Sequence, residues 1–300
     1  MEGPSIHLAA EQLQPFVGRR INRVTGNSRI GIDRFRGKTL KGVFAWGKHL
    51  VFQFDTFALR VHFMLWGTFA ATVKGTSVTG DYRRSGPPRL VLGFPNGEIT
   101  IWSASLKWLE ETDARRDYDF TADIMSDSWD SKAALRKVRA FPRSEIADVL
   151  LDQEIFAGVG NIIKNEVLFR TRTSPFLSAG RLSDRKLRAI VADARVFSLR
   201  FLELRRVFAL RKNLEIYGRS LCPACGGKVY RRIHGARGRR SFFCARCQKV
   251  PRSRLATPAG AVSRGGARAP RGSSASPVSS AATRTGRRAA VRRSGKTGNS

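Results

Sequence analysis

Four cysteines near the end of the 300-residue chain are spaced like the ligands of one metal ion. They occur as Cys222-Pro-Ala-Cys225 and Cys244-Ala-Arg-Cys247, with eighteen residues between the pairs. Two residues inside each pair let both thiolates converge on one ion, and four sulfurs complete a tetrahedral Zn²⁺ site with no position open for a substrate. Two disulfides or four buried thiols are the alternative, but the chain has no other cysteine and nothing in it is typical of a secreted protein. We therefore expect a structural zinc and look for the chemistry elsewhere.

Positive charge dominates the composition. The chain has 55 Lys and Arg against 23 Asp and Glu, a formal net charge of +32, which is typical of a protein that binds nucleic acid or an anionic surface. A membrane is the weaker candidate, because no apolar run approaches ~20 residues and the N-terminus lacks a signal-peptide pattern. We expect an intracellular protein, in the cytoplasm and associated with the nucleoid. The basic loop between the cysteine pairs, residues 231–240, is a candidate phosphate-binding segment.

The segment 251–300 differs in composition from the rest of the chain. It holds eleven Lys and Arg, no acidic residue and no aromatic residue. Such a segment cannot bury enough apolar area to offset the entropy of ordering, so we expect a disordered polybasic tail. Two interpretations stay open: a non-specific DNA tether, or a solvated extension with no specific partner.

Apolar runs separated by turns predict a β-rich region after a short opening helix. Residues 5–16 carry apolar side chains at helical spacing, and Pro4 suits a first helical turn. From about Arg20 to Leu109 the pattern changes to strands, and Pro95-Asn96-Gly97 between two of them is a strong hairpin signal. The strands predict an antiparallel sandwich or flattened barrel. They are expected at residues 50–54, 59–63, 90–94 and 99–102.

Helical periodicity dominates beyond Asp113, from Ser131 to Leu210. Ser183 is a suitable N-cap, and the apolar residues that follow it recur on one helical face. The cysteine module follows from about Leu214. The sequence therefore predicts a second, helical domain between the β-rich region and the metal site.

Four short motifs occur in the order seen in a known family. They are Glu2-Gly3-Pro4, Gly47-Lys48 on a strand, Ala157-Gly-Val-Gly-Asn161 in a turn between helices, and a four-cysteine module ending in Cys247-Gln248. Over residues 1–249 the chain resembles formamidopyrimidine-DNA glycosylase and endonuclease VIII. The resemblance implies an α+β fold: an N-terminal catalytic β-sandwich with a leading helix (1–127), a helix-two-turn-helix DNA-binding domain (128–213), a four-cysteine zinc finger (214–250) and the tail (251–300).

The resemblance implies that the N-terminal amine is the nucleophile. In that family the amine attacks C1′ of a damaged nucleotide, the base leaves, and the resulting Schiff base drives strand cleavage by elimination. An α-amino group, with an ordinary pKa of ~7.7 to 8.0, is the amine that is easiest to deprotonate near neutral pH. Glu2 matches the family's catalytic acid, which needs a pKa raised by burial. Without the other motifs, Glu2 would merely favour a helix start.

Met1 stands where the family has a proline. The family begins Met-Pro-Glu and loses its methionine, but here Met1 directly precedes Glu2, whose size disfavours methionine removal. We therefore expect the primary amine of Met1 to occupy the proline position. A proline Schiff base is a fixed cation, whereas one from a primary amine can lose its proton and is then a poorer electron sink. Base excision is expected to survive, while strand cleavage by β- or β,δ-elimination weakens or is lost.

Three further positions match DNA-contacting residues of the family. Lys48 corresponds to the lysine that contacts a phosphate and the damaged site, and Gly47 before it allows a ligand to approach the backbone closely. The alternative is that Lys48 is a solvated lysine on a strand. Asn161 corresponds to the helix-two-turn-helix asparagine, in a turn whose backbone N–H groups suit a phosphate, although its glycines would also simply end a helix. Arg239 aligns best with the phosphate-gripping arginine, and a one-residue slip would give that role to Arg240.

The loop from His62 to Gly67 matches the family's void-filling segment. Extrusion of a nucleotide leaves a hole in the duplex that needs an apolar or planar plug, so Met64, Leu65 and Trp66 are the candidates. The alternative is that these three residues belong to the core.

Two more positions bear on substrate and packing. His49 and His62 have no paired acid or nucleophile in the sequence, so we interpret both as packing residues. Ser5 stands where the purine-directed branch of the family carries another acidic residue, and the opening Glu2-Gly3-Pro4 is closer to endonuclease VIII. The resemblance therefore favours oxidised pyrimidines as substrates.

The resulting hypothesis is a monomeric DNA glycosylase and AP lyase that acts on double-stranded DNA with oxidised bases or abasic sites. It needs structural zinc but no catalytic metal or redox cofactor. A catalytically silent protein that binds damaged or abasic DNA is the first alternative, because Met1 and Ser5 depart from the family pattern. An RNA-associated zinc-ribbon protein is the second, although it leaves Glu2, Lys48 and Asn161 unexplained.

Overall fold

The computed structural model describes residues 1–82 and 86–255 of the chain. These residues belong to one compact unit, Met1–Ala256. Apart from its first five positions, the predicted disordered tail lies outside the described residues. In the described part of the chain, no helix is long and apolar enough to cross a membrane.

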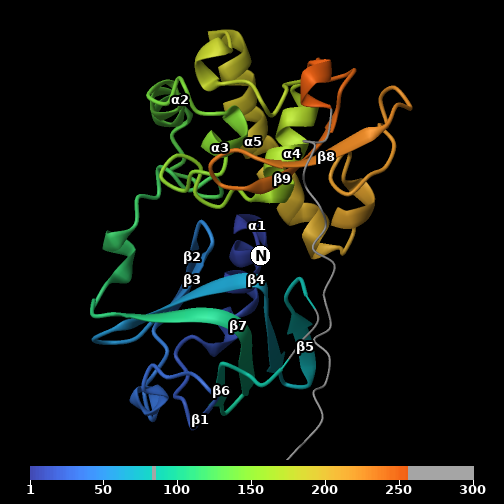
Figure 1. Cartoon of the computed structure of the whole chain (residues 1–300). Helices are drawn as coiled ribbons and strands as arrows, with labels where there is room; N and C mark the ends of the chain where they lie inside the picture. The colour runs from blue at the N-terminus through green and yellow to red at the C-terminus, as the bar shows by residue number, and fades with distance from the viewer. Residues whose placement is uncertain (83–85, 256–300) are drawn as a thin grey trace, which may run out of the picture. The chain divides into compact units, whose positions relative to one another are not determined.

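The opening helix lies between the sheet and the other helices (Figure 1). α1 (Gly3–Gln12) has Pro4 in its first turn, and a short 3-10 helix, Gln14–Phe16, follows it. The apolar positions predicted for this helix are buried, as expected. α1 contacts strand β2 (Gly42–Trp46) and helix α5 (Asp184–Arg206), so it links the two main parts of the molecule.

Seven strands form one antiparallel sheet. The order is β1-β6-β7-β4-β3-β2, and β5 pairs with the end of β4. The predicted hairpin turn at residues 95–97 connects β6 to β7. The other bounds are β1 (Arg23–Thr25), β3 (His49–Gln53), β4 (Ala58–Val73), β5 (Thr76–Thr79), β6 (Leu90–Phe94) and β7 (Gly97–Leu109).

The two longest strands, β4 and β7, run through both halves of this sheet. Their first pairing joins Ala58–Phe63 to Ala104–Leu109 beside β3, and their second joins Thr68–Val73 to Gly97–Trp102 beside β6. A β-bulge separates the pairings, and Ser103 of β7 adopts a positive φ of 47° there. Apolar residues of both halves share one core, which confirms the predicted sandwich. The β4 strand, expected to end before residue 64, continues through the bulge.

The helical region follows β7. Asp130 caps α2 by accepting hydrogen bonds from the N–H groups of Lys132 and Ala133, and Ser183 caps α5 as the sequence predicts. The predicted apolar face of α5 is buried. The helices are α2 (Ser131–Arg139), α3 (Ile146–Val149), α4 (Asn161–Arg170) and α5, with 3-10 turns at Ile32–Phe35, Ala114–Asp117, Ala179–Arg181 and Leu210–Asn213.

The cysteine module is built on a two-stranded hairpin. β8 (Val229–His234) pairs antiparallel with β9 (Arg239–Cys244), and a 3-10 turn, Arg252–Arg254, closes the described chain. β9 packs against α4. The domain boundaries at 127/128, 213/214 and 250/251 stay predictions.

Candidate active site

The side chain of Glu2 lies at the N-terminus of α4. Its carboxylate accepts hydrogen bonds from the backbone N–H groups of Gly160 (3.2 Å), Ile162 (2.6 Å) and Ile163 (3.2 Å). A side chain at Gly160 would collide with this carboxyl group, so only glycine permits the approach. Burial raises the pKa of Glu2 above its ordinary value, although the charge of Lys48 and these hydrogen bonds oppose the rise. Glu2 can therefore hold a proton at a higher pH than an exposed glutamate.

The N-terminal amine lies beside this carboxyl group. Burial is the main cause that lowers the pKa of the Met1 amine from 8.0; Lys48 and Arg239 lower it further, while Asp81 and Glu2 oppose them. The Met1 side chain packs against the core of the sheet, and the N–H of Gly3 donates a 2.9 Å hydrogen bond to the Gly158 carbonyl. These contacts fix the position of a partly buried amine that loses its proton more easily than a free N-terminus.

Lys48 lies in the turn between β2 and β3. Gly47 precedes it with a positive φ of 52°, and a Cβ there would meet the Ala157 side chain and the Gly158 amide at 3.1 Å. Burial lowers the pKa of Lys48 to about 8; Arg239 and Arg237 contribute to the decrease, and Glu2 opposes it. Met1, Glu2 and Lys48 therefore form one electrostatically coupled cluster, although they come from the N-terminus and the β2–β3 turn.

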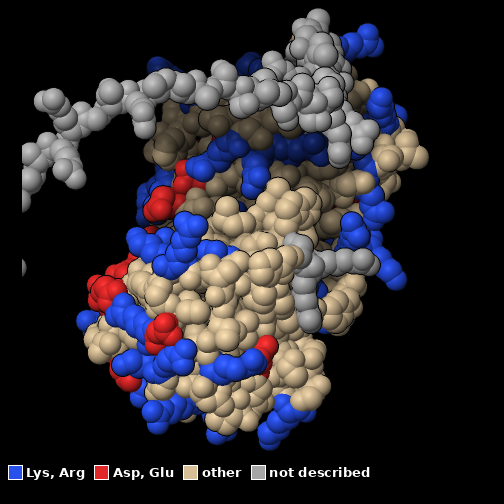
Figure 2. Space-filling view, turned by 60° about the horizontal axis from the view of Figure 1, so that its bottom comes forward, with Lys and Arg blue, Asp and Glu red and all other residues tan. Residues whose placement is uncertain are grey.

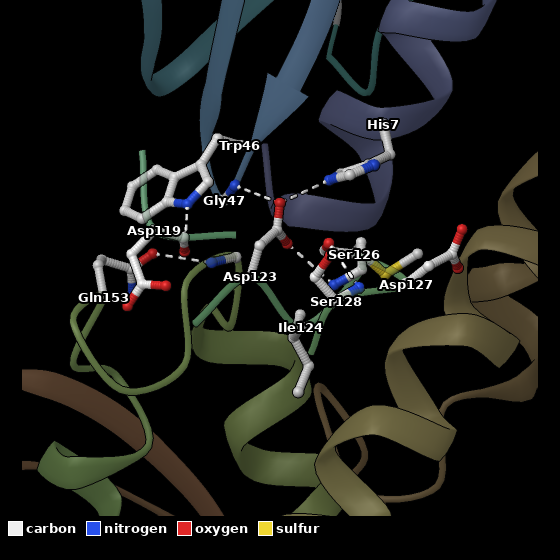
Figure 3. Close-up of polar contacts among 12 residues, drawn as sticks. His7, Trp46, Gly47, Asp119, Asp123, Ile124, Ser126, Asp127, Ser128 and Gln153 are labelled. Carbon is white, nitrogen blue, oxygen red and sulfur yellow. Dashed lines mark hydrogen bonds and ion pairs between the residues drawn. The ribbon is translucent and has the colours of Figure 1, made fainter. Parts of the chain in front are cut away.

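Asp123 connects three of the segments that meet at this cluster (Figure 3). Its carboxylate, which is fully buried, accepts hydrogen bonds from His7 Nε2 of α1 (3.1 Å), the Gly47 amide (3.1 Å) and the Met125 amide (2.9 Å). The Gly47 bond fixes the turn that carries Lys48. The sequence analysis did not identify Asp123 or His7. The one signal for Asp123 was its place directly before the apolar pair Ile124-Met125, where an aspartate is unusual.

Asn161 is the first residue of α4. The backbone N–H groups around it, predicted to hold a phosphate, instead donate to Glu2, because the Glu2 carboxylate fills the positive end of the helix. The Oδ1 atom of Asn161 is buried and has no hydrogen-bond partner among residues 1–82 and 86–255. The side-chain oxygen of Asn161, rather than the amides at the start of α4 that Glu2 occupies, is thus available for a further hydrogen bond.

Arg239 and Arg240 begin β9, and both are exposed. Side chains alternate along a strand, so the two arginines point to opposite faces of the hairpin. The charge of Arg239 lowers the pKa of Met1, Lys48 and Lys164, and Arg240 is not among the causes of these shifts. Arg239 therefore faces the cluster.

Met64, Leu65 and Trp66 lie in the β4 bulge, not in a loop after a strand. Their exposed fractions are 54%, 61% and 63%, so they are not core residues. The Trp66 ring contacts Tyr82 edge-on, with 5.4 Å between ring centroids. Three adjacent large apolar side chains thus stand in solvent.

The four cysteines converge on one point. Their Sγ atoms lie within 4.8 Å of one another, with Cys222 and Cys247 at 3.8 Å and Cys225 and Cys244 at 3.6 Å. Four sulfurs at ~2.3 Å from a tetrahedral ion would be about 3.8 Å apart. The set therefore fits one tetrahedral metal ion.

Comparisons with known proteins agree with this architecture. A family model described as "Formamidopyrimidine-DNA glycosylase H2TH domain" matches residues 120–199. The mouse protein Endonuclease 8-like 3 is 30% identical over 218 residues, which cover 72% of this chain and 35% of that protein. Probable endonuclease 8 2 of Streptomyces coelicolor is 29% identical over 276 residues, 84% of this chain and 95% of that protein. The formamidopyrimidine-DNA glycosylase of Lactococcus lactis, crystallised with AP-site DNA, superposes with a TM-score of 0.71 at 20% identity, covering 83% of this chain and all of that one.

Residues 120–199 are the H2TH domain of the formamidopyrimidine-DNA glycosylase and endonuclease VIII family. The chain spans only 35% of the mouse relative but nearly all of the Streptomyces one. The region that the family model matches contains α2 to α4 and most of α5. It includes Asp123, Asn161 and the glycine turn before α4.

Two histidines lie closer to the site than the sequence indicates. His49 and His62 are cross-strand partners whose rings meet edge-on at 5.5 Å, in line with a packing role. Burial lowers both pKa values, that of His49 to about 4, and Lys48 lowers both further. The charge of the N-terminal amine also acts on His62. His62 is thus close to the cluster of Met1, Glu2 and Lys48, a position that spacing alone does not reveal.

Proposed function

We propose that this protein is a base-excision-repair DNA glycosylase and AP lyase that removes oxidised bases, with pyrimidines favoured. The observation that carries the proposal is the cluster of the half-buried Met1, Glu2 and Lys48, in which burial shifts the pKa of the amine, the carboxyl group and the lysine. Nucleophilic attack by an amine needs its neutral form, and burial of Met1 favours that form. Acid catalysis needs a carboxyl group that keeps its proton at higher pH, and burial raises the pKa of Glu2 in that direction.

The reaction would proceed by attack of the Met1 nitrogen on C1′ of the extruded nucleotide. The glycosidic C–N bond breaks, and the base leaves with that electron pair and takes up a proton that the attacking nitrogen gives up. The nitrogen lone pair then forms a second bond to C1′ while the C1′–O4′ bond breaks and O4′ takes the proton of Glu2, which gives a protonated Schiff base and a free 4′-hydroxyl group. The deprotonated Glu2 stays in place because three N–H groups of α4 hold its carboxylate.

The DNA contacts follow from the same arrangement. Lys48 and the Asn161 side chain would bind phosphates near the extruded nucleotide, and Arg239 would bridge the flanking phosphates, with Arg240 as the alternative. Met64, Leu65 and Trp66 would fill the vacated space in the duplex, which their exposure supports. Figure 2 shows Lys and Arg side chains over much of the visible face, with acidic side chains in smaller groups. We place this activity on nucleoid DNA in the cytoplasm, with the protein acting as a monomer.

Incubation with duplexes that carry one oxidised pyrimidine, one oxidised purine or one abasic site tests this proposal. We expect release of free base, faster for the pyrimidine, and a covalent adduct after borohydride reduction. A duplex of the same sequence without a lesion is the control. Binding of the lesion duplex without base release would contradict the enzyme and support the second candidate, a catalytically silent protein that binds damaged DNA. The presence of Met1 in place of the family's proline favours this second candidate.

We propose zinc as the ion of the four-cysteine site, because thiolates at this spacing and geometry suit Zn²⁺. Bound zinc would tie β8 and β9 to the cysteine loops and keep Arg239 in place; it takes no part in the reaction.

Removal of the metal tests this structural role. We expect a strong chelator to release one zinc per chain and to weaken lesion-duplex binding by at least about 10-fold, because the metal supplies folding energy to the module. Metal analysis and titration with a fluorescent duplex measure the two effects, and re-addition of zinc should restore binding. Unchanged binding after complete metal loss would contradict the role.

A further inference from the structure

A chain of four polar side chains, two of them buried and two half-buried, joins the helical region to β9. The Glu145 carboxylate accepts from His234 Nδ1 (2.5 Å), and His234 Nε2 lies 2.7 Å from the Ser241 hydroxyl. Lys164 Nζ, on α4, donates to Ser241 Oγ (3.0 Å) and to the Arg240 carbonyl (3.2 Å). We call Glu145, His234, Ser241 and Lys164 the α4–β9 clamp.

The inner half of the clamp, Lys164 and Ser241, is buried, and a charge there has a high desolvation cost. Ser241 is fully buried and Lys164 is 1% exposed, whereas most lysines lie in solvent. Burial lowers the pKa of Lys164 to about 8; Asp148, Glu2 and Glu145 oppose the decrease, and Arg239 adds to it. A methionine of similar length would avoid the desolvation cost. The buried hydrogen bonds of Lys164 and Ser241 therefore define the geometry of β9 against α4, rather than adding stability.

The clamp acts on the strand residues next to Arg239. The carbonyl of Arg240 receives hydrogen bonds from Lys164 and also from Asn165 Nδ2 (3.3 Å), and His234 is the cross-strand partner of Arg239. Alternation along β9 places Arg239 and Ser241 on the same face. The same helix, α4, holds Glu2 at its first turn. One rigid element therefore sets both the proposed acid and the start of the strand that carries the proposed phosphate-binding arginine.

We propose that Lys164 and Ser241 are positioning residues, which fix Arg239 at the distance from Glu2 that one extruded nucleotide requires. This inference rests on the proposed role of Arg239. It gives the clamp a function in DNA binding and none in bond breaking. Loss of the clamp should cost affinity for a damaged duplex while the bound complex still reacts.

The test uses the full-length, zinc-loaded protein and a duplex with one stable abasic-site analogue. Lys164→Met and Ser241→Ala should each weaken binding by about 10-fold, and should lower the slope of log affinity against log salt by about 0.9, the signature of one lost phosphate contact. Base release from an oxidised-pyrimidine duplex at saturating protein should stay within about 2-fold of the unmodified rate, because Met1, Glu2 and Lys48 are untouched.

Two comparisons make the result decisive. Lys186→Met is the matched control, because Lys186 also donates to a backbone carbonyl (2.7 Å), but to that of Thr171, the residue that caps the C-terminus of α4, and not to a residue of β9. Arg239→Ala should reproduce the loss, and Arg239→Ala with Ser241→Ala should be no weaker than Arg239→Ala alone, because both remove the same contact.

The outcomes separate the two hypotheses. If Arg239→Ala lowers the salt slope and the clamp variants do not, while zinc content stays at one per chain, the positioning role is overturned and the role of Arg239 survives. If Arg239→Ala leaves affinity and slope unchanged, the proposed role of Arg239 fails, and the clamp inference fails with it.

Discussion

Glu2→Gln should reduce base release by about 10²–10⁴-fold, the usual contribution of a positioned general acid. Glutamine retains one acceptor for the amides at the start of α4 but has no proton of carboxylic acidity to donate to O4′. Binding of a duplex with an abasic-site analogue should change little. Single-turnover base release at saturating protein measures the effect, and fluorescence titration measures the binding.

Glu11→Gln is the matched control for that substitution. Glu11 lies on the same opening helix but pairs with Arg206 at the surface, where an ion pair contributes little. Its removal should leave the rate within about 2-fold. Equal rates for Glu2→Gln and the unmodified protein would contradict the acid role.

The pH dependence of base release provides a second readout of the same groups. Burial raises the pKa of Glu2, so its protonated form persists to higher pH and the rate falls as pH rises through that pKa. Burial lowers the pKa of Met1, so its neutral form appears at lower pH and the rate rises as pH rises through that pKa. The product of the two fractions is a bell-shaped profile, and Glu2→Gln should lose the descending limb that Glu2 causes.

One glycine added before Met1 should abolish base release and borohydride trapping, a loss of at least about 10²-fold. An extra residue moves the free amine by up to about 3.8 Å, and misplacement by ~1 Å is enough to cost ~10²-fold. A glycine added after Ser300 is the control for chain extension. Peptide mapping of the reduced adduct in the unmodified protein should find the DNA on the Met1 nitrogen. An adduct on Lys48 instead would contradict the assignment of the Met1 amine as the nucleophile.

Proline inserted between Met1 and Glu2 extends this prediction to strand cleavage. The initiating methionine is removed before a small residue such as proline, so the new N-terminus would be a secondary amine at the Met1 position. Its Schiff base keeps its positive charge, and strand cleavage relative to base release should therefore increase. Gel analysis of cleaved and uncleaved abasic products measures this ratio.

Local patterns in the sequence predict most of the fold, because the signals act over short distances. The cap at Ser183, the buried face of α5 and the hairpin turn before Gly97 each depend on neighbours within a few residues. The cysteine spacing predicts the converging sulfurs for the same reason. The residues that form the helices, the hairpin and the cysteine site can thus be predicted from local sequence patterns.

The contacts that assemble the site are not local. Glu2 binds amides about 160 residues away in sequence, and Asp123 joins His7 to Gly47. No periodicity links such positions, and the resemblance indicated Glu2 and Asn161 as site residues without predicting that Glu2 binds the start of α4. The bulge that exposes Trp66 depends on the register of β4 against β7. The residue pattern of one strand does not predict that register.

The glycine contacts beneath the N-terminus restrict how the molecule can move. Gly3 lies against Gly158, where a Cβ on Gly3 would come within 2.6 Å of the Gly158 Cα, and Gly47 approaches the same turn. Backbone touching backbone leaves no side chain to compress, so a residue larger than glycine at Gly3 would push the N-terminus away from the turn before α4. These glycine contacts therefore keep Met1 and Glu2 close to the start of that helix.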